Sequence, residues 1–345
     1  VQPSFPWSQQ MVLLLLSFLL ALVSSIVVAA CLSFLTRLQQ ELQGPDAVTL
    51  EDPSTAGPVP LPSVFSPATK SLSVIIPAYN EQDRLRATLE ETISYLQQRR
   101  NRQGPHFTWE IIVVDDGSKD QTVRVAMAFV QQHGFDSVRV LRVPVNRGKG
   151  HAVRRGMLIA RGEYCLFTDA DGATRFSDLE MLEVEMSKCM TLPRGTGTVP
   201  DGSLGVAVGS RAHLHKAAAA KRGAVRNLLT KGFHFLVTFV AGSRIRDTQC
   251  GFKLFTRRAA AMLYSNQRLQ RWCFDVELIY LADALGIPIA EVFVEWTEMP
   301  GSKIRATSII SMAWELLTVK VAYNLGFWRV YSEAESHFSS TATDK

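Results

Sequence analysis

The sequence predicts an α/β protein whose mostly parallel sheet carries helices on both faces, together with one amino-terminal transmembrane helix. Three observations carry this prediction. Short β-branched runs alternate with helical patterns from residue 72 onward, polar residues follow four of these runs in succession, and residues 11–35 contain no charged side chain. Repeated βα units favour a parallel sheet that is covered on both sides. The length of 345 residues is sufficient for one large domain or two small ones.

The apolar stretch at residues 11–35 has the length of a membrane span. As a helix it would be roughly 37 Å long, which exceeds the ~30 Å hydrocarbon core and permits crossing with a tilt. A cleaved signal peptide is the alternative, but its apolar region is only about 7–15 residues long and follows positive charge, and residues 1–10 have none. Arg37 follows the span, so the positive-inside bias places the next domain on the cytosolic side. We therefore expect residues 1–36 to be a retained anchor.

After the anchor, the sequence predicts a linker and then a series of alternating strands and helices. Residues 37–69 are rich in proline and lack periodicity, which is typical of a linker. Expected strands follow at residues 72–76, 110–114, 137–143, 163–167, 204–208 and 289–296. Expected helices lie near residues 81–100, 120–133, 148–161 and 176–190. Residues 191–202 are predicted to be a loop, and residues 331–345 a flexible tail.

Two later helical patterns have two interpretations. Residues 224–241 and 308–330 are apolar on one side and carry aromatic and basic residues. Packing against the core is the ordinary explanation for such faces, whereas aromatic residues beside Lys320 and Arg329 also suit a membrane interface. We expect residues 304–330 to form amphipathic helices, and the sequence leaves both interpretations, core packing and contact with a membrane interface, open.

The net charge and the cysteines of the chain favour some classes of ligand and cellular compartment over others. The net charge of +5 fits an anionic ligand or an anionic membrane surface. Nucleic acid is disfavoured because no run of Lys and Arg reaches five and no zinc-finger spacing occurs. The five cysteines are scattered and lack a CxxC pair, which argues against a disulfide framework and for a reducing compartment.

Two carboxylates follow the apolar run at residues 164–167. Asp169 and Asp171 are two positions apart, so on an extended chain their side chains point to the same side. Converging carboxylates at the end of a strand suit a hard divalent cation such as Mg²⁺ or Mn²⁺, which keeps positions open for phosphate oxygens. The alternative is a turn in which Asp hydrogen-bonds its own backbone.

Polar sets end four expected strands, at residues 77–81, 115–118, 146–150 and 169–172. In open α/β sheets the ligand lies outside the carboxyl ends of the strands, so these sets predict a nucleotide site. Asp116 could accept a hydrogen bond from a base or a ribose, and Lys149 could offer a charge to phosphate. A tight turn is the other interpretation of Gly148-Lys149-Gly150. Walker A spacing and a GxGxxG after a strand are both missing, which disfavours P-loop and dinucleotide redox chemistry.

Arg211 and Asp247 extend the polar set further along the chain. Arg211 follows the expected strand at residues 204–208 and could clamp phosphate oxygens, or it could form a surface ion pair. Asp247 opens a polar loop that precedes a short strand. Its carboxylate could be a base, an orienting group or a turn cap.

Eight segments, in order and spacing, resemble one enzyme family: IIPAYNE, VVDDGSKDQT, NRGKG, DADGAT, GSRAHL, DTQCGFKLF, FDVEL and PGSK. The chain is similar over residues 71–330 to the GT-A fold glycosyltransferases that make polyprenyl-phosphate sugars. The first four segments are shared by many nucleotide-sugar transferases, whereas GSRAH with DTQCGFKLF is more selective. The resemblance implies a GT-A catalytic domain at residues 70–303. It also implies transfer of glucose with inversion from UDP-glucose to dolichyl phosphate, for protein N-glycosylation.

The resemblance also implies roles for individual residues. Residues that would bind the nucleotide are Pro77, Tyr79, Glu81, Asp116, Lys149, Asp169 and Ala170. Catalytic roles would fall to Asp171, Arg211 and Asp247, and contacts to the phosphates or the acceptor to Arg211, Lys253 and Lys303. Mg²⁺ or Mn²⁺ would bind Asp169 and Asp171. Related mannosyl enzymes carry a Gln ligand where this chain has Ala173, so water or substrate would fill that coordination position.

Three alternatives remain open on sequence alone. The chain could be a dolichyl-phosphate mannosyltransferase that uses GDP-mannose, or a membrane-tethered nucleotide-sugar-binding protein without turnover. A processive polysaccharide synthase fits less well, because its QxxRW motif is only approached at residues 267–272. For the favoured function we expect a single-pass protein of the endoplasmic reticulum membrane. Its catalytic domain would face the cytosol, with the lipid bilayer as a partner and no nucleic acid.

Overall fold

The computed structural model describes residues 9–43, 49–52, 59–190, 203–213, 224–300 and 306–331. The chain divides into two compact units, Val1–Pro45 and Asp46–Lys345. Each unit is described by itself below.

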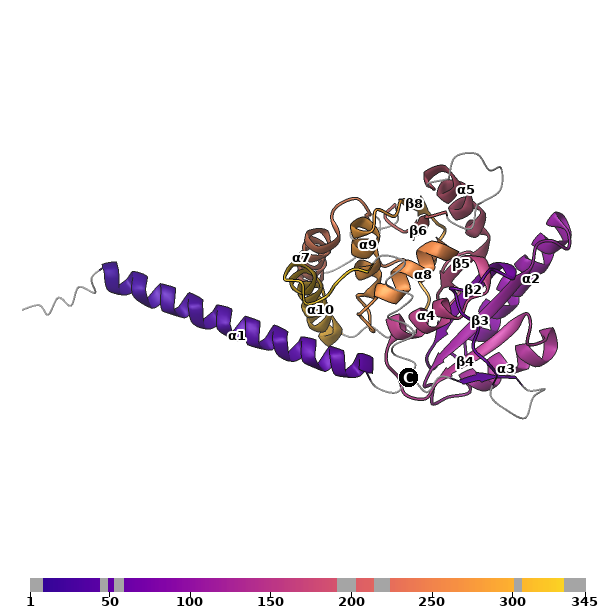
Figure 1. The fold of residues 1–345 in the computed structure, drawn as a ribbon, viewed down its shortest axis with the longest axis horizontal. Coiled ribbons are helices and arrows are strands. Elements are labelled where there is room, and N and C mark those ends of the chain that lie inside the picture. The colour runs from indigo at the N-terminus through magenta and orange to yellow at the C-terminus, as the bar shows by residue number, and fades with distance from the viewer. Residues whose placement is uncertain are drawn as a thin grey trace, which may run out of the picture. The chain divides into compact units, whose positions relative to one another are not determined.

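The first unit contains one long helix, α1 (Gln9–Gln43) (Figure 1). Residues Gln10–Ala30 have a mean hydropathy of 2.9, and none of this stretch is buried against protein. By length and composition, this is the one helix in the described part of the chain that could cross a membrane. The helix continues past residue 36, where we expected the linker to begin. Residues 38–43 are good helix formers, and the next proline comes only at residue 45.

The second unit is built on an eight-stranded sheet in the order β1-β4-β3-β2-β5-β7-β6-β8. Its strands are β1 (Thr49–Glu51), β2 (Lys70–Ala78), β3 (Trp109–Asp116), β4 (Val138–Val143), β5 (Gly162–Thr168), β6 (Val206–Ser210), β7 (Phe252–Thr256) and β8 (Ile289–Phe293). All run in one direction except β1 and β7, which are antiparallel to their neighbours. The predicted α/β fold with a mostly parallel sheet is therefore confirmed.

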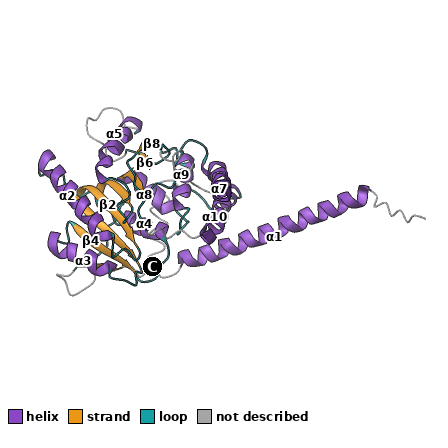
Figure 2. Ribbon diagram, turned by 180° about the vertical axis from the view of Figure 1, so that it is seen from behind, coloured by secondary structure: helices purple, strands orange, loops and turns teal. Residues whose placement is uncertain are grey.

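Helices cover both faces of this sheet (Figures 1 and 2). One face carries α2 (Leu85–Gln103), α3 (Thr122–His133), the short 3₁₀ helix η1 (Phe176–Asp178) and α5 (Leu179–Cys189). The other carries α4 (Lys149–Leu158) and α8 (Arg257–Asn266), with α9 (Phe274–Ala284), α7 (Ala224–Ala241) and α10 (Ala306–Asn324) packed outside them.

The two faces follow from the alternation of side chains along each strand. Val74 and Ile76 of β2 belong to the core under α2 and α3. Ile75 points to the opposite face, where it lies under α4. A Cβ on Gly156 would come within 2.6 Å of Ile75 and 2.8 Å of Val114, so the missing side chain lets α4 lie close to the sheet.

Strand direction determines which residues meet at the carboxyl edge of the sheet. Strands β2, β3 and β5 are parallel, so the residues that follow them lie on one edge. Strand β7 runs the other way and begins at Phe252, which pairs with Thr168 at the end of β5. The loop before β7 therefore lies beside Asp169, whose backbone N–H donates to the Gly251 carbonyl at 3.1 Å.

Several boundaries differ from the sequence expectations. Strand β8 ends at Phe293, and Trp296 makes only an isolated bridge to Thr174. Within the predicted linker, residues 49–51 form β1 and pair with β4, because the alternation of Thr, Leu and Glu buries Leu50 alone. The predicted loop at 191–202 and the tail from 332 onward lie outside the described residues. Cys165, Cys189, Cys250 and Cys273 are free thiols.

Candidate active site

Asp169 and Asp171 follow β5 at the carboxyl edge of the sheet. The Asp169 carboxylate lies 2.6 Å from the Lys149 ammonium. The Asp171 carboxylate accepts a hydrogen bond from the Ala173 amide at 3.1 Å and lies 3.9 Å from the Arg84 guanidinium. Burial, and then the charge of Asp169, raise the pKa of Asp171 above its usual value. The two carboxylates thus have different basic partners, Lys149 for Asp169 and Arg84 for Asp171.

Gly251 provides the space for the Asp169 carboxylate. A Cβ at position 251 would overlap the carboxylate oxygens, so only glycine lets the loop before β7 pass this close. No group of three or more His, Cys, Asp and Glu that could hold a metal occurs among the described residues. Two carboxylates without a third protein ligand fit Mg²⁺ or Mn²⁺ that takes its remaining ligands from phosphate and water.

Asp116, at the end of β3, holds the loop that begins α4. Its buried carboxylate accepts hydrogen bonds from the Asn146 side chain at 2.8 Å, the Arg147 amide at 2.9 Å and the Gly148 amide at 2.8 Å. Burial raises the pKa of Asp116 to about 6, against the lowering effect of the two amides. The residue we predicted to hold uridine thus also fixes the loop that carries Lys149.

Lys149 is the first residue of α4 and reaches back over the sheet edge. Its ammonium lies 5.1 Å from the ring centre of Phe167 as well as beside Asp169. Burial opposes the charged form, but the negative charge of Asp169, followed by that of Asp275, raises the pKa of Lys149. The side chain is therefore a cation held at the predicted phosphate position.

The segment after β2 supplies a further cation that the sequence did not single out. The Glu81 carboxylate accepts two hydrogen bonds of 2.7 Å from the Arg84 guanidinium, which also donates to the Pro300 carbonyl at 3.0 Å. Arg84 thus joins the predicted nucleotide segment, the segment after β8 and Asp171. Its position three residues after Glu81, one helical turn away, was the available signal.

Three other predicted nucleotide residues lie around this segment. Pro77 pairs with Val114 within the sheet, and Tyr79 is half-buried just beyond it. Between Tyr79 and Glu81 the chain turns at Asn80, which adopts a φ of 52°. Ala170 is buried, and its carbonyl accepts a hydrogen bond from Thr88 at 2.9 Å. All three lie along the same edge as Asp169, through the ends of β2 and β5.

Arg211 and Asp247 form a bidentate pair. The Arg211 side chain donates to the Asp247 carboxylate at 2.7 and 3.0 Å, and the Arg211 amide donates at 2.9 Å. Burial favours the neutral acid, but the hydrogen bonds and charge of Arg211 hold the pKa of Asp247 below its usual range. The guanidinium also lies 5.3 Å from the Trp296 ring centre. Four residues after Asp247, Gly251 lies against the Asp169 carboxylate, so one loop connects the pair with Asp169.

Of the remaining two predicted residues, the structure describes only Lys253, which does not join this surface. Lys253 is fully buried, and its ammonium donates to Asp275 at 2.5 Å and to the Cys250 carbonyl at 2.6 Å. It does not reach the exposed edge, where we expected it to contact phosphate. Lys303 lies outside the described residues.

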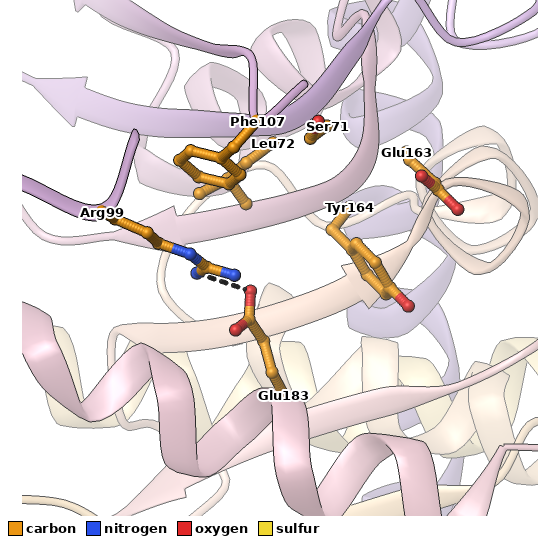
Figure 3. Close-up of a pocket in the computed structure, with 7 residues that line it drawn as sticks. All are labelled: Ser71, Leu72, Arg99, Phe107, Glu163, Tyr164 and Glu183. Atoms are coloured by element: carbon orange, nitrogen blue, oxygen red, sulfur yellow. Dashed lines mark hydrogen bonds and ion pairs between the residues drawn. The ribbon is translucent and has the colours of Figure 1, made fainter. Parts of the chain in front are cut away.

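A separate pocket lies at the opposite edge of the sheet, near the amino ends of β2 and β5, and has a volume of about 240 Å³. Figure 3 shows Arg99 and Glu183 facing each other across it, with a 2.9 Å ion pair between them. Its lining residues are Ser71, Leu72, Arg99, Phe107, Glu163, Tyr164 and Glu183. It contains none of the predicted site residues, and the Arg99–Glu183 pair already satisfies its principal charges.

The fold and the polar residues at the carboxyl ends of its parallel strands are typical of a protein that binds a nucleotide-type ligand. Residues 73–261 match the family model "Glycosyl transferase family 2". The chain is 49% identical over 271 residues to a human protein named dolichyl-phosphate beta-glucosyltransferase, covering 78% of this chain and 81% of that protein. A Drosophila melanogaster protein of the same name is 45% identical over 312 residues, covering 90% of this chain and 93% of that protein. The chain belongs to glycosyl transferase family 2 and, within it, to the dolichyl-phosphate beta-glucosyltransferases.

Among solved structures, glucosyl-3-phosphoglycerate synthase from Mycobacterium tuberculosis in complex with uridine-diphosphate aligns with a TM-score of 0.48 and 18% sequence identity. The alignment covers 75% of this chain and 87% of that chain.

Proposed function

We propose that this protein transfers glucose from UDP-glucose to a phosphate oxygen of dolichyl phosphate, with inversion at the anomeric carbon. The observation that carries the proposal is the arrangement at the carboxyl edge of the sheet. There, the Asp169 carboxylate pairs with Lys149, and Asp171 lies beside Arg84. The loop that carries Asp247, the partner of Arg211, passes against the Asp169 carboxylate at Gly251. In this proposal these groups bind one diphosphate. The names of the relatives supply the sugar and the lipid class.

The nucleotide half of the donor lies along the ends of β2, β3 and β5 in this proposal. Asp116 keeps the loop at residues 146–148 in place, so that Lys149 stands at the start of α4 with its charge toward the diphosphate. Pro77, Tyr79, Glu81 and Ala170 form the adjoining surface for uridine. Arg84 keeps the Glu81 carboxylate fixed through two hydrogen bonds.

Asp169 and Asp171 would hold Mg²⁺ or Mn²⁺. When bound, the ion neutralises negative charge on the departing diphosphate. The protein's own contribution is to orient each carboxylate, with Gly251 making room for Asp169 and the Ala173 amide donating a hydrogen bond to Asp171. Since Ala173 offers no side-chain ligand, water or donor oxygens would complete the coordination.

The acceptor half of the reaction needs orientation more than a base. A phosphate monoester has a second pKa near 6, so its attacking oxygen is already largely ionised at neutral pH. The depressed pKa of Asp247 makes this carboxylate a weak base. Its contacts support another role, in which Asp247 aims the Arg211 guanidinium at phosphate oxygens. The new bond forms between the lipid phosphate oxygen and glucose C1 as the bond from C1 to UDP breaks.

The proposed membrane setting rests on α1 and on exposed apolar side chains of the second unit. Helix α1 would anchor the protein in the endoplasmic reticulum membrane, with the catalytic unit in the cytosol. In that unit, Phe235 and Phe239 of α7 are 71% and 53% exposed, and Leu325 and Phe327 after α10 are 68% and 56% exposed. Such side chains beside Lys320 suit contact with a lipid headgroup layer.

The test is transfer of radiolabelled glucose by the detergent-purified full chain. UDP-glucose and dolichyl phosphate should give labelled lipid, EDTA should stop the reaction, and added Mn²⁺ or Mg²⁺ should restore it. UDP should compete more strongly than GDP. If GDP-mannose were the better donor, the protein would be a mannosyltransferase. If UDP-glucose bound in a metal-dependent way without yielding product, it would be a binding protein.

A further inference from the structure

A buried ion pair lies directly behind the active-site edge. Lys253 of β7 and Asp275 of α9 have side chains that are only 1% and 4% exposed, and their charged atoms lie 2.5 Å apart. The second hydrogen bond of Lys253 goes to the Cys250 carbonyl at 2.6 Å. Because the ammonium is shielded from solvent, it cannot serve as a direct contact to substrate in this position.

A gain in the stability of the fold does not explain why these two charged side chains are buried. Moving two charges out of water costs about as much free energy as their attraction returns, and apolar side chains of similar size often serve equally well. The first turn of α9 does favour an acidic side chain at position 275, since a helix amino terminus attracts negative charge. That preference does not account for a buried lysine on the neighbouring strand. The contacts of the pair indicate what else it does.

Lys253 fixes the loop that connects the two halves of the active site. The hydrogen bond to Cys250 holds the residue next to Gly251, and Gly251 in turn makes room for the Asp169 carboxylate and accepts its amide hydrogen bond. Three residues earlier in the same loop, Asp247 holds Arg211. A shift of the Cys250 carbonyl would therefore move both ends of this loop.

Asp275 acts on the donor side of the same arrangement. The Asp275 carboxylate pairs with Lys253, and the Lys253 and Lys149 ammonium groups both lie near the ring of Phe167. The centre of the Phe167 ring is 5.1 Å from the Lys149 ammonium and 5.8 Å from that of Lys253. Lys253 and Phe167 are register partners on β7 and β5, so their side chains point to the same face of the sheet.

We propose that Lys253 and Asp275 are positioning residues, which together set the distance between the Asp169 carboxylate on the donor side and the Asp247–Arg211 pair on the acceptor side. The inference rests on the proposed function, because that function assigns Asp169 to the donor and the Asp247–Arg211 pair to the acceptor. It predicts that loss of the pair impairs the chemical step more than donor binding. A misplacement of ~1 Å at a reacting centre can lower turnover about 100-fold.

The experiment compares Lys253→Met, Asp275→Asn and the double variant Lys253→Met/Asp275→Leu in the full chain. Each single variant leaves one buried charge without its partner and should melt at a lower temperature. The double variant removes both charges and should regain most of that thermal stability. The matched control is Glu110→Gln, which breaks a buried ion pair with Arg139 at the opposite edge of the sheet. Three quantities are measured: the melting temperature, the affinity for UDP in the presence of Mn²⁺ by calorimetry, and kcat with KM for UDP-glucose.

For the double variant we expect a melting temperature near that of the wild type, UDP affinity within about threefold, and kcat still about 10- to 100-fold lower. Glu110→Gln should lower the melting temperature and leave kcat unchanged. The proposal is overturned if kcat recovers together with stability, if Glu110→Gln lowers kcat equally, or if UDP affinity falls as far as kcat. If the wild-type protein gives no product in the same assay, the proposed function fails. If the wild type turns over normally and the double variant does too, only the inference about Lys253 and Asp275 fails.

Discussion

At the scale of single residues, the surroundings give three aspartates different proton affinities. Burial raises the pKa of Asp116 to about 6. Burial and the charge of Asp169 raise the pKa of Asp171, whereas hydrogen bonds and charge from Arg211 outweigh burial and lower the pKa of Asp247. The three groups therefore suit different tasks: holding a loop, sharing a cation, and aiming a guanidinium.

Asp116 should make donor binding depend on pH. The carboxylate accepts two amide hydrogen bonds from the loop before Lys149, and protonation would weaken them. We expect KM for UDP-glucose to rise as pH falls through about 6, the pKa of Asp116. Steady-state kinetics between pH 5 and 8 measure this, and Asp116→Asn should have a raised KM that no longer changes with pH.

Unfolding of the protein at low pH would not explain this loss of donor binding, because protonation of Asp116 favours the folded state. The folded pKa of Asp116 is about 6 and its ordinary value is 3.8. A carboxyl whose pKa is raised by folding contributes most to stability below 3.8, and that contribution is lost as pH rises through about 6. Acidification toward pH 5.5 thus increases the contribution of Asp116 to stability. A melting temperature that fell in parallel with donor affinity would contradict our explanation.

Asp247→Asn should separate turnover from donor binding. Asparagine keeps the size of the side chain but loses the negative charge that aligns Arg211 through 2.7 and 3.0 Å hydrogen bonds. We expect kcat to fall by about 10- to 100-fold and KM for UDP-glucose to change by less than about threefold. Asp136→Asn is the matched control, since that exposed carboxylate pairs with Arg161 at the opposite edge of the sheet. A raised KM with normal kcat would assign Asp247 to donor binding instead.

At the scale of elements, the antiparallel strand β7 brings the two halves of the site together. It lies between β5 and β6, and its amino end is beside the carboxyl ends of both. Residues after β5, before β7 and after β6 therefore share one edge. A parallel strand at this place would send the loop with Asp247 and Gly251 to the other edge, away from Asp169.

The sequence could predict the parallel βα units but not the placement of β7. Alternation of β-branched runs and helical patterns is a local signal, and it located β2, β3, β4 and β5. Strand order and direction depend on pairings between distant segments, which local patterns do not encode. For the same reason Lys253 was expected at the phosphates: its burial depends on α9, which supplies Asp275 from 22 residues further along the chain.

Gly251→Ala should test the contact between the β7 loop and β5. An added Cβ would overlap the Asp169 carboxylate. Overpacking of this kind costs about 1–3 kcal/mol, and the displaced carboxylate should lower kcat roughly 100-fold. Calorimetry should show a weaker Mn²⁺-dependent affinity for UDP.

Gly232→Ala in α7 is the control for this substitution. Gly232 has no atom within 4 Å of an added Cβ, and alanine in a helix interior is favoured by about 0.5–1 kcal/mol. This variant should keep normal kcat and melt at the same or a higher temperature. Unchanged Mn²⁺-dependent UDP affinity in Gly251→Ala would show that Asp169 tolerates the added methyl group and that glycine is not required there.

At the scale of the whole molecule, the chain combines an apolar helix with a unit that has its own core. The second unit contains the complete sheet and every described site residue. The first unit adds α1, whose stretch Gln10–Ala30 is suited to a bilayer. The donor is water-soluble and the acceptor is a lipid, so the protein must bind a nucleotide sugar and also stay close to a membrane. We assign the first task to the second unit and the second task to α1. The donor needs only the second unit, whereas the lipid is encountered far more often by a protein that stays at the membrane.

Deletion of residues 1–45 should therefore affect the two substrates differently. The affinity for UDP should remain that of the full chain, because every proposed nucleotide contact belongs to the second unit. Anchoring raises the effective concentration of a membrane partner, so its loss should raise KM for dolichyl phosphate in vesicles by about tenfold or more. A short, water-soluble prenyl phosphate serves as the control acceptor, on which both proteins should turn over equally. If the truncated protein still sedimented with vesicles and kept the KM of the full chain, the exposed side chains of Phe235, Phe239, Leu325 and Phe327 would be sufficient for membrane binding, and α1 would not be the main anchor.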